Sequence, residues 1–167
     1  MSKKPFVAIL MGSDSDLPVM QATVDVLNGF GITTEVRITS AHRTPDRTHA
    51  YVKDADKRGC AVFIAAAGLA AHLAGTVAAL TLKPVIGVPM DAGPLQGMDS
   101  LLSTVQMPGG IPVACVAIGK AGAKNAGYLA AQIIALQDTG TAEKIQAERS
   151  KNAEAIASKD EALQTRN

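Results

Sequence analysis

The chain has 167 residues, 47% of them hydrophobic and 19% charged, which is the composition of one globular domain and excludes a disordered protein. Sixteen Lys and Arg residues oppose fifteen Asp and Glu residues, and the formal net charge is +1. With aromatic residues at 3% and no Trp, the chain lacks both the basic balance and the stacking platforms that nucleic-acid binding needs.

Short apolar runs alternate with helical patterns along the chain. The first run, residues 6–11, is followed by a Gly- and Ser-rich turn and by a helix that ends at Gly29. Further strands are expected at residues 35–38, 61–65, 85–88 and 113–117, and further helices at residues 44–58, 70–82, 98–107 and 124–137. Five strands alternating with helices predict an α/β fold with a doubly wound parallel sheet.

Gly140 marks the one credible boundary inside a single domain at residues 1–167. It separates an α/β body, residues 5–138, from a tail with helical propensity, residues 140–167. The tail has too little apolar surface to bury by itself, and the Ala- and Gly-rich helices of the body are apolar on most sides. Both features predict a homo-oligomer.

The chain carries no membrane or export signal. No apolar run reaches the ~18 residues of a membrane span, and no long hydrophobic segment of a signal peptide follows Met1. Cys60 and Cys115 lie far apart and predict buried thiols in a reducing compartment, and no His, Asp or Glu cluster has metal-ligand spacing. We therefore expect a cytoplasmic protein without a metal or a membrane partner.

Ligands of such sheets bind beyond the carboxyl ends of the strands, so the loops there hold the candidate site. The first loop, Gly12 to Asp16, has hydroxyls and backbone N–H groups that could hold a phosphate, although an ordinary capped turn has the same pattern. It lacks both the Walker and the dinucleotide signatures. Since a carboxylate repels phosphate, the partners expected for Asp16 are two ribose hydroxyls.

The second loop is the most informative stretch. His42 and Arg43 follow Ser40 directly after a strand, and Thr44 and Pro45 open the next helix. A guanidinium binds phosphate through two parallel hydrogen bonds, and an imidazole moves protons near neutral pH. The pair predicts an anion clamp beside a proton carrier, with a surface pair in a capping turn as the alternative interpretation.

The third loop places Gly68, Ala70 and Ala71 around His72. Small side chains let backbone amides approach a ligand closely, although they also suit close packing of a helix on a sheet. For the His72 ring, the pattern itself favours a satisfied, partly buried histidine over a ligand. No Ser-centred nucleophile motif is present.

Six segments together resemble the N5-carboxyaminoimidazole ribonucleotide mutase family of purine biosynthesis, in order and with correct spacing over residues 6–137. They are Met11 to Asp16, Ser40 to Asp46, Ala70 to Leu73, Met98 to Ser103, Gln106 to Pro112 and Ala117 to Gly122. The resemblance implies a three-layer α/β/α, flavodoxin-like subunit in a homo-octamer, with sites at subunit contacts. It also implies a cofactor-free shift of a carboxylate from the exocyclic N5 to C4 of an aminoimidazole ribonucleotide, a small-molecule substrate.

The resemblance also implies roles for individual residues. Gly12, Ser13 and Asp16 would bind the phosphoribosyl group, and Arg43 would clamp its phosphate with help from Ser40. His42 would be the catalytic proton carrier. The wall around the transferred carboxylate would consist of Gly68, Ala71, His72 and Leu73.

The chain departs from the family pattern in two segments. Leu69 stands where the family has Gly, and Ala74 where it has Pro; the loop that begins Met90-Asp91-Ala92 is also unusual. If residue 69 is left-handed, Leu costs about 1–2 kcal/mol there and narrows the carboxylate pocket. Two alternatives stay open: a carboxylase that uses free carbon dioxide, against which Arg43 and Pro45 argue, and a non-catalytic nucleotide-binding paralogue.

Overall fold

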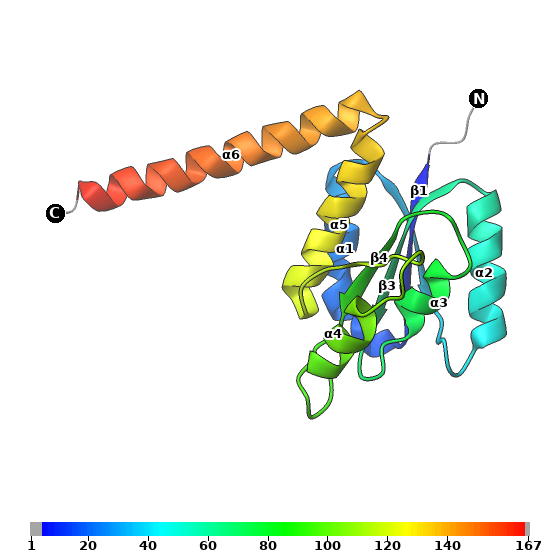
Figure 1. Cartoon of the computed structure of the whole chain (residues 1–167). Coiled ribbons are helices and arrows are strands. Elements are labelled where there is room, and N and C mark those ends of the chain that lie inside the picture. The colour runs from blue at the N-terminus through cyan, green and yellow to red at the C-terminus, as the bar shows by residue number, and fades with distance from the viewer. Residues whose placement is uncertain (1–4, 166–167) are drawn as a thin grey trace.

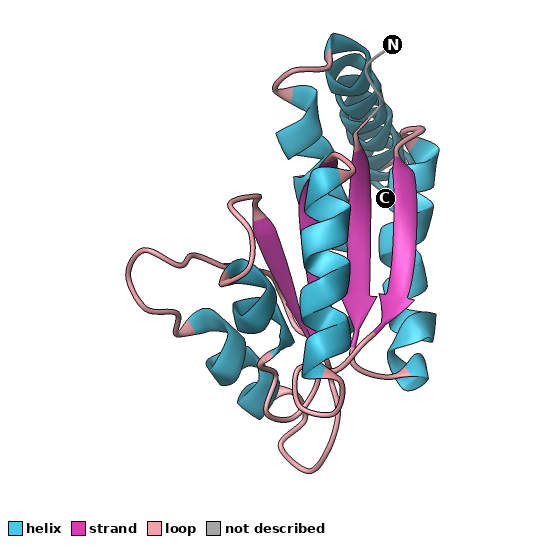
Figure 2. Ribbon diagram, turned by 90° about the vertical axis from the view of Figure 1, so that its right-hand side faces the viewer, coloured by secondary structure: helices cyan, strands magenta, loops and turns pink. Residues whose placement is uncertain are grey.

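The computed structural model describes residues 5–165, and its centre is a five-stranded parallel sheet in the order β2-β1-β3-β4-β5. The strands are β1 (Phe6–Met11), β2 (Thr33–Ile38), β3 (Cys60–Ala67), β4 (Val85–Pro89) and β5 (Ala114–Cys115). Helices cover both faces of the sheet (Figures 1 and 2). The predicted doubly wound α/β/α fold is therefore confirmed, with the flavodoxin-like strand order.

Seven helical segments complete the fold. They are the 3₁₀ turn η1 (Asp14–Asp16) and the helices α1 (Leu17–Gly29), α2 (Pro45–Lys57), α3 (Leu73–Ala78), α4 (Met98–Val105), α5 (Gly119–Ala135) and α6 (Thr139–Gln164). Strand β1 lies between β2 and β3 and is buried at all six positions, whereas β2 is an edge strand with mostly exposed residues. The winding direction reverses between β1 and β3, which is where such folds bind ligands.

Two hydrophobic cores lie on opposite faces of the sheet. Alternate residues of β1 point to opposite sides, so Ile9 enters one core and Leu10 the other. The first core packs against α1 and α5, which approach so closely that a Cβ on Gly127 would lie 3.0 Å from the Val26 side chain. The second core packs against α2 and α3. The sheet is thus fixed from both sides, and only its ends are open to a ligand.

Several predicted elements have different bounds in the structure. The helix expected at residues 70–82 is only α3, because the backbone of Ala71 is bound by α4: its N–H donates to Ser103 Oγ (3.0 Å), and Thr104 Oγ1 donates to its carbonyl (3.5 Å). The strand expected at residues 113–117 is the two-residue β5. Helix α5 starts at Gly119, which has a φ of +70°, rather than at residue 124.

Helix α6 leaves the body and projects away from it (Figure 1). Only Thr141 and Ile145 of this helix are buried, and Lys144 Nζ donates to the carbonyl of Phe30 at 2.9 Å. Every residue from Arg149 to Thr165 is exposed. Within residues 5–165, no helix combines the length and the apolar character needed to cross a bilayer. The start of the chain, on which the expectation of no signal peptide rests, falls at residues 1–4, outside the described residues.

Candidate functional site

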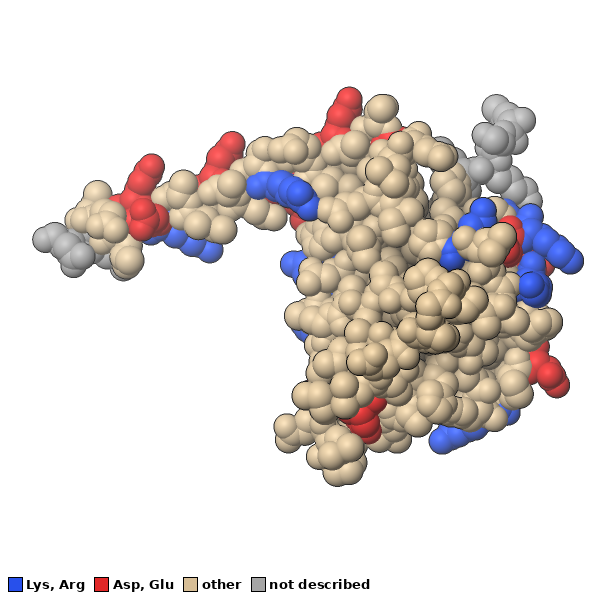
Figure 3. Space-filling model, viewed as in Figure 1, with Lys and Arg blue, Asp and Glu red and all other residues tan. Residues whose placement is uncertain are grey.

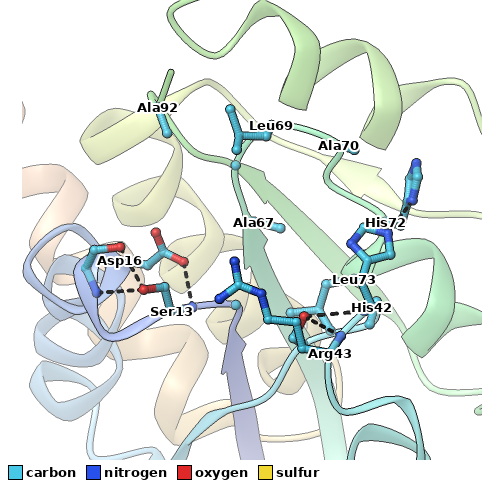
Figure 4. A pocket seen from close by; sticks show the side chains of 15 residues that line it. Ser13, Asp16, His42, Arg43, Ala67, Leu69, Ala70, His72, Leu73 and Ala92 are labelled. Atoms are coloured by element: carbon cyan, nitrogen blue, oxygen red, sulfur yellow. Dashed lines mark hydrogen bonds between the residues drawn. The ribbon is translucent and has the colours of Figure 1, made fainter. Parts of the chain in front are cut away.

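The loops after β1, β2 and β3 meet at one pocket at the carboxyl edge of the sheet (Figure 4). The loop after β4 adds Ala92 to its rim. The residues that line the pocket are Gly12, Ser13, Ser15, Asp16, Ser40, Ala41, His42, Arg43, Ala67, Gly68, Leu69, Ala70, His72, Leu73 and Ala92. The structure therefore brings together the residues singled out from the sequence, with one exception.

The exception is Ala71, which is buried at 2% exposure and does not line the pocket. Its N–H and carbonyl face α4 instead, so it anchors the third loop. Six lining residues were not assigned a binding or catalytic role from the sequence: Ser15, Ala41, Ala67, Leu69, Ala70 and Ala92. A signal existed for Ala92, because it follows the fourth strand at the same edge of the sheet.

The first loop forms a reciprocal cap over η1. Ser15 N–H donates to Ser13 Oγ at 3.3 Å, and Ser13 N–H donates to Asp16 Oδ2 at 3.2 Å. Burial raises the pKa of the Asp16 carboxyl above its usual value, while hydrogen bonds from the backbone of Ser13 and Gly12 act in the opposite direction. The turn thus fixes a desolvated carboxylate beside two exposed or half-exposed hydroxyls.

The second loop is tied together by Ser40. Its Oγ accepts the N–H groups of His42 (3.3 Å) and Arg43 (3.1 Å), so both side chains project from a fixed turn. Thr44 occupies the N-cap of α2 as expected, but its hydroxyl accepts the N–H of Ser40 at 2.9 Å instead of capping the helix. The structure therefore shows Ser40 and Thr44 holding the loop from both ends.

Arg43 extends its side chain across the pocket toward Ser13 and Asp16 (Figure 4). In the part of the chain that the structure describes, no carboxylate lies within 4.0 Å of its guanidinium. An exposed, unpaired guanidinium next to serine hydroxyls and backbone N–H groups is suited to an anion such as a phosphate. Asp16 would sit beside this anion rather than on it.

His42 and His72 form the other side of the pocket. Their Nε2 and Nδ1 atoms are 2.7 Å apart, and the two rings meet edge to face at 84° with centroids 4.8 Å apart. One proton occupies this bond, donated by either ring. His72 is exposed and lines the pocket, whereas the sequence pattern favoured a partly buried histidine; its role in the site stays a prediction.

The third loop has an unusual backbone. Leu69 has a φ of +57°, so the left-handed conformation considered for this position is present. A Cβ on Gly68 would lie 3.0 Å from the Cβ of Ala92, which shows how closely the loops after β3 and β4 approach. Among the described residues, no group of three or more His, Cys, Asp or Glu side chains is placed to hold a metal ion.

Comparison with known proteins gives one family. A family model described as AIR carboxylase matches residues 6–155. A protein of Synechocystis sp. named N5-carboxyaminoimidazole ribonucleotide mutase is 59% identical over 145 residues, which are 87% of this chain and 81% of that one. A protein of Bacillus subtilis with the same name is 49% identical over 160 residues, covering 96% of this chain and 99% of its own.

Solved structures give the same result for the fold. The crystal structure of Treponema denticola PurE superimposes with a TM-score of 0.86 at 33% identity, covering 95% of this chain and 98% of that chain. The family match covers the pocket, since residues 6–155 include every residue that lines it.

Proposed function

The chain belongs to the AIR carboxylase family, and we propose that it catalyses the reaction for which its curated relatives are named. It is an isomerase that converts N5-carboxyaminoimidazole ribonucleotide to 4-carboxy-5-aminoimidazole ribonucleotide in purine biosynthesis. The observation that carries the proposal is the single pocket in which an exposed imidazole, an unpaired guanidinium and a desolvated carboxylate meet.

The phosphoribosyl group is bound by the first two loops. Arg43 clamps the phosphate, together with the hydroxyl of Ser13 and the backbone at Gly12. Asp16 accepts hydrogen bonds from the ribose hydroxyls, which suits a fixed carboxylate close to, but not on, the phosphate. Ser40 supports this arrangement by holding Arg43 through its backbone N–H. The base is thereby directed toward the two histidines.

The chemistry needs one group that first gives and then takes a proton. Protonation of N5 by His42 breaks the N–C bond, whose electrons return to nitrogen, and carbon dioxide is released in the pocket. The freed amine makes C4 nucleophilic, and C4 attacks the carbon of carbon dioxide to form the new C–C bond. His42 then removes the C4 proton, which restores the aromatic ring and regenerates the acid. The steps balance without a cofactor.

His72 and the third loop surround the reacting end. The hydrogen bond between His72 and His42 fixes the orientation of the His42 ring. Gly68 and Leu73 line the wall, and Ala71 supports it from behind through its backbone. Small apolar residues leave room for carbon dioxide and exclude water, which favours recapture over escape.

The direct carboxylase, which would take free carbon dioxide and the uncarboxylated ribonucleotide, is not favoured. The relatives at 49–59% identity are named as mutases, and the Arg43 and Pro45 of the second loop agree with that branch. The non-catalytic alternative would leave the paired histidines without a use.

We also propose that the subunits assemble into a homo-octamer in the cytoplasm. The face that carries α4 has few charges (Figure 3) and exposes a set of apolar side chains: Leu95, Met98, Leu102, Val105 and Ile111. We propose one domain that consists of the body, residues 5–138, and the helical tail, residues 140–167. The body and the projecting helix α6 would bury this apolar surface between copies of the chain. The free thiols of Cys60 and Cys115 agree with a reducing compartment.

The test is an assay of the purified protein with N5-carboxyaminoimidazole ribonucleotide, compared with the uncarboxylated ribonucleotide plus bicarbonate. We expect turnover of the first substrate to exceed that of the second at equal concentration. Faster carboxylation of the second substrate would instead establish the direct carboxylase, and ribonucleotide binding without turnover of either would establish the non-catalytic module.

A further inference from the structure

Helix α4 turns a group of hydroxyls toward the loops at the carboxyl edge of the sheet. Ser103 and Thr104 follow Ser100 by three and four residues, a spacing that places them with it on one face of the helix. Ser100 Oγ donates to the carbonyl of Met90 at 2.8 Å, and Ser103 Oγ accepts the N–H of Ala71 at 3.0 Å. None of the three hydroxyls lines the pocket. Their contacts are with the loops of the site and not with the space that a ligand would fill.

The hydroxyl of Ser103 has a specific place in the third loop. It donates its hydrogen to the carbonyl of Asp99 inside α4 at 2.7 Å, so its oxygen remains free to accept the N–H of Ala71. The same oxygen lies 3.4 Å from the carbonyl oxygen of Leu69. Leu69 has a φ of +57°, which a side chain disfavours and which persists only where the surroundings enforce it. Ser103 thus holds the turn just after its left-handed residue.

The residue after this anchor is His72. Its carbonyl accepts both the N–H and the hydroxyl of Thr76 at 3.0 Å, and its own N–H donates to the carbonyl of Ala70 at 2.9 Å. The backbone of His72 is therefore fixed by α3 on one side and by the anchored Ala71 on the other. Figure 4 shows its ring beside that of His42, and their Nδ1 and Nε2 atoms are 2.7 Å apart. A shift of Ala71 would change this distance.

We propose that Ser103 is a positioning residue, whose hydroxyl holds His72 at hydrogen-bond distance from His42 through the N–H of Ala71. The inference rests on the proposed function, in which His42 carries the proton. Loss of the hydroxyl leaves the N–H of Ala71 without its partner in the interior and allows the turn to rearrange. His42 then loses the partner that orients its ring. The loops that would bind the phosphoribosyl group are untouched, so turnover suffers and binding does not.

The chain has three histidines, so chemical modification can follow each ring separately. Diethyl pyrocarbonate attacks a ring nitrogen with a free lone pair, and in the pair one ring has this nitrogen occupied by the hydrogen bond. His49 is exposed on α2 outside the pocket and serves as the internal reference. Modification rates are measured by peptide mass spectrometry, and steady-state kinetics with the carboxylated ribonucleotide are measured in parallel.

Three variants of the full chain are compared with the native protein. Ser103→Ala removes the hydroxyl, and it is expected to fold because Ala favours a helix. Ser103→Thr keeps a hydroxyl at the same position. Ser158→Ala is the matched control, since Ser158 is an exposed serine of helix α6 outside the pocket.

In Ser103→Ala, we expect the slower ring of the pair to react roughly threefold faster or more relative to His49, because its lone pair is released. We expect kcat to fall roughly 10- to 100-fold, as when a catalytic group is displaced by up to about 1 Å, with KM within about twofold of the native value. Ser103→Thr and Ser158→Ala should retain native rates.

An unchanged modification ratio in Ser103→Ala overturns the positioning role whatever happens to kcat, and so does a rise in KM with native kcat. An equal change in Ser103→Thr or Ser158→Ala overturns it as well, since the hydroxyl of Ser103 would then not be the cause. Failure of the proposed function is distinguishable: the native protein would show no isomerisation, while the modification rates would still test the anchor.

Discussion

His42 Nε2 lies 2.7 Å from His72 Nδ1, although 30 residues separate the two histidines and they stand on different loops. Their rings are nearly perpendicular, at 84°. The bond joins the loop after β2 to the loop after β3, across the position of β1 in the sheet. His42 is therefore oriented by a partner that its own loop does not contain.

Replacing His72 with Phe tests whether this partner positions the proton carrier. The ring volume is approximately kept while the hydrogen bond is lost, so the His42 ring is free to rotate away from its productive orientation. We expect kcat to fall by roughly 100-fold, the cost of displacing a catalytic group by about 1 Å, with KM for the ribonucleotide nearly unchanged. Steady-state kinetics check this split. A rise in KM with native kcat would assign His72 to substrate binding instead.

Replacing His42 with Asn removes the proton carrier itself. We expect kcat to fall by roughly 10²–10⁴-fold, the range of general acid–base catalysis, while the ribonucleotide still binds. Calorimetric titration of the variant with the uncarboxylated ribonucleotide measures binding separately from turnover. Native turnover in this variant would reject the mechanism and favour a non-catalytic role for the pocket.

Arg43 is expected to hold the phosphate. Arg43→Ala should weaken binding of the ribonucleotide by ~1.5–3 kcal/mol, the scale of a charge-assisted hydrogen bond, and Arg43→Lys should recover only part of this because an ammonium cannot bind in a two-pronged manner. Equilibrium titrations with the ribonucleotide and its dephosphorylated nucleoside separate the contributions. If both variants bound the ribonucleotide with native affinity, the phosphate assignment would be wrong.

The sheet was predictable from the sequence because its signals are local. Continuous apolar runs such as residues 6–11 and the Gly- and Pro-marked helix ends identify the elements, and the parallel topology then places the loops after β1, β2 and β3 at one edge. Those loops do line one pocket. What their side chains bind stays a prediction.

The predictions that were wrong or missing concern contacts between residues far apart in the sequence. The Ala-rich pattern of residues 70–82 has helical propensity throughout, but Ser103 and Thr104 hold the backbone of Ala71 in a turn and shorten the helix to α3. The same contact removes Ala71 from the pocket. The pairing of His42 with His72 was equally inaccessible, since no local pattern indicates which of two distant loops supplies a hydrogen-bond partner.

We expect the ionised Asp16 carboxylate to lower the free energy of unfolding and to strengthen binding of the ribonucleotide. Because burial raises its folded-state pKa, its contribution to the free energy of unfolding falls as the pH rises from the unfolded value through the folded one. Asp16→Asn keeps an oxygen that accepts the Ser13 N–H, so we expect a more stable protein above this interval and an equally stable one below it. Ribonucleotide affinity should fall roughly 10- to 100-fold, as for a lost charge-assisted bond.

Denaturant unfolding at a series of pH values measures the first effect, and equilibrium titration the second. Asp25→Asn is a suitable control, because Asp25 is an exposed carboxylate that does not line the pocket. If Asp16→Asn bound the ribonucleotide like the native protein, the proposed ribose contact would be wrong. If Asp16→Asn were less stable than the native protein at neutral pH, burial of the Asp16 carboxylate would not lower the free energy of unfolding.

Glu35 makes the opposite contribution to the pH dependence of stability. It accepts hydrogen bonds from the Arg58 guanidinium, one of them 2.9 Å long, and from the Tyr51 hydroxyl at 3.0 Å. The Arg58 guanidinium, and to a lesser extent the Tyr51 hydroxyl, holds the pKa of the Glu35 carboxyl below its usual value, although burial acts in the other direction. The carboxylate form therefore stabilises the fold above its unfolded-state pKa, and this contribution is lost as the pH falls through the lowered folded-state pKa.

Glu35→Gln should consequently cost only about 0.5–1 kcal/mol near neutral pH, because both side chains of the pair are partly exposed and solvent screens them. The difference from the native protein should shrink as the pH is lowered and vanish once Glu35 is protonated in the folded state. Asp54→Asn is the control: Asp54 also bonds Arg58, at 2.6 Å, but is 61% exposed, so its loss should cost less. Urea unfolding across the acid range decides the matter, since a difference that persists at the lowest pH would show that Glu35 stabilises the fold through packing rather than through its charge.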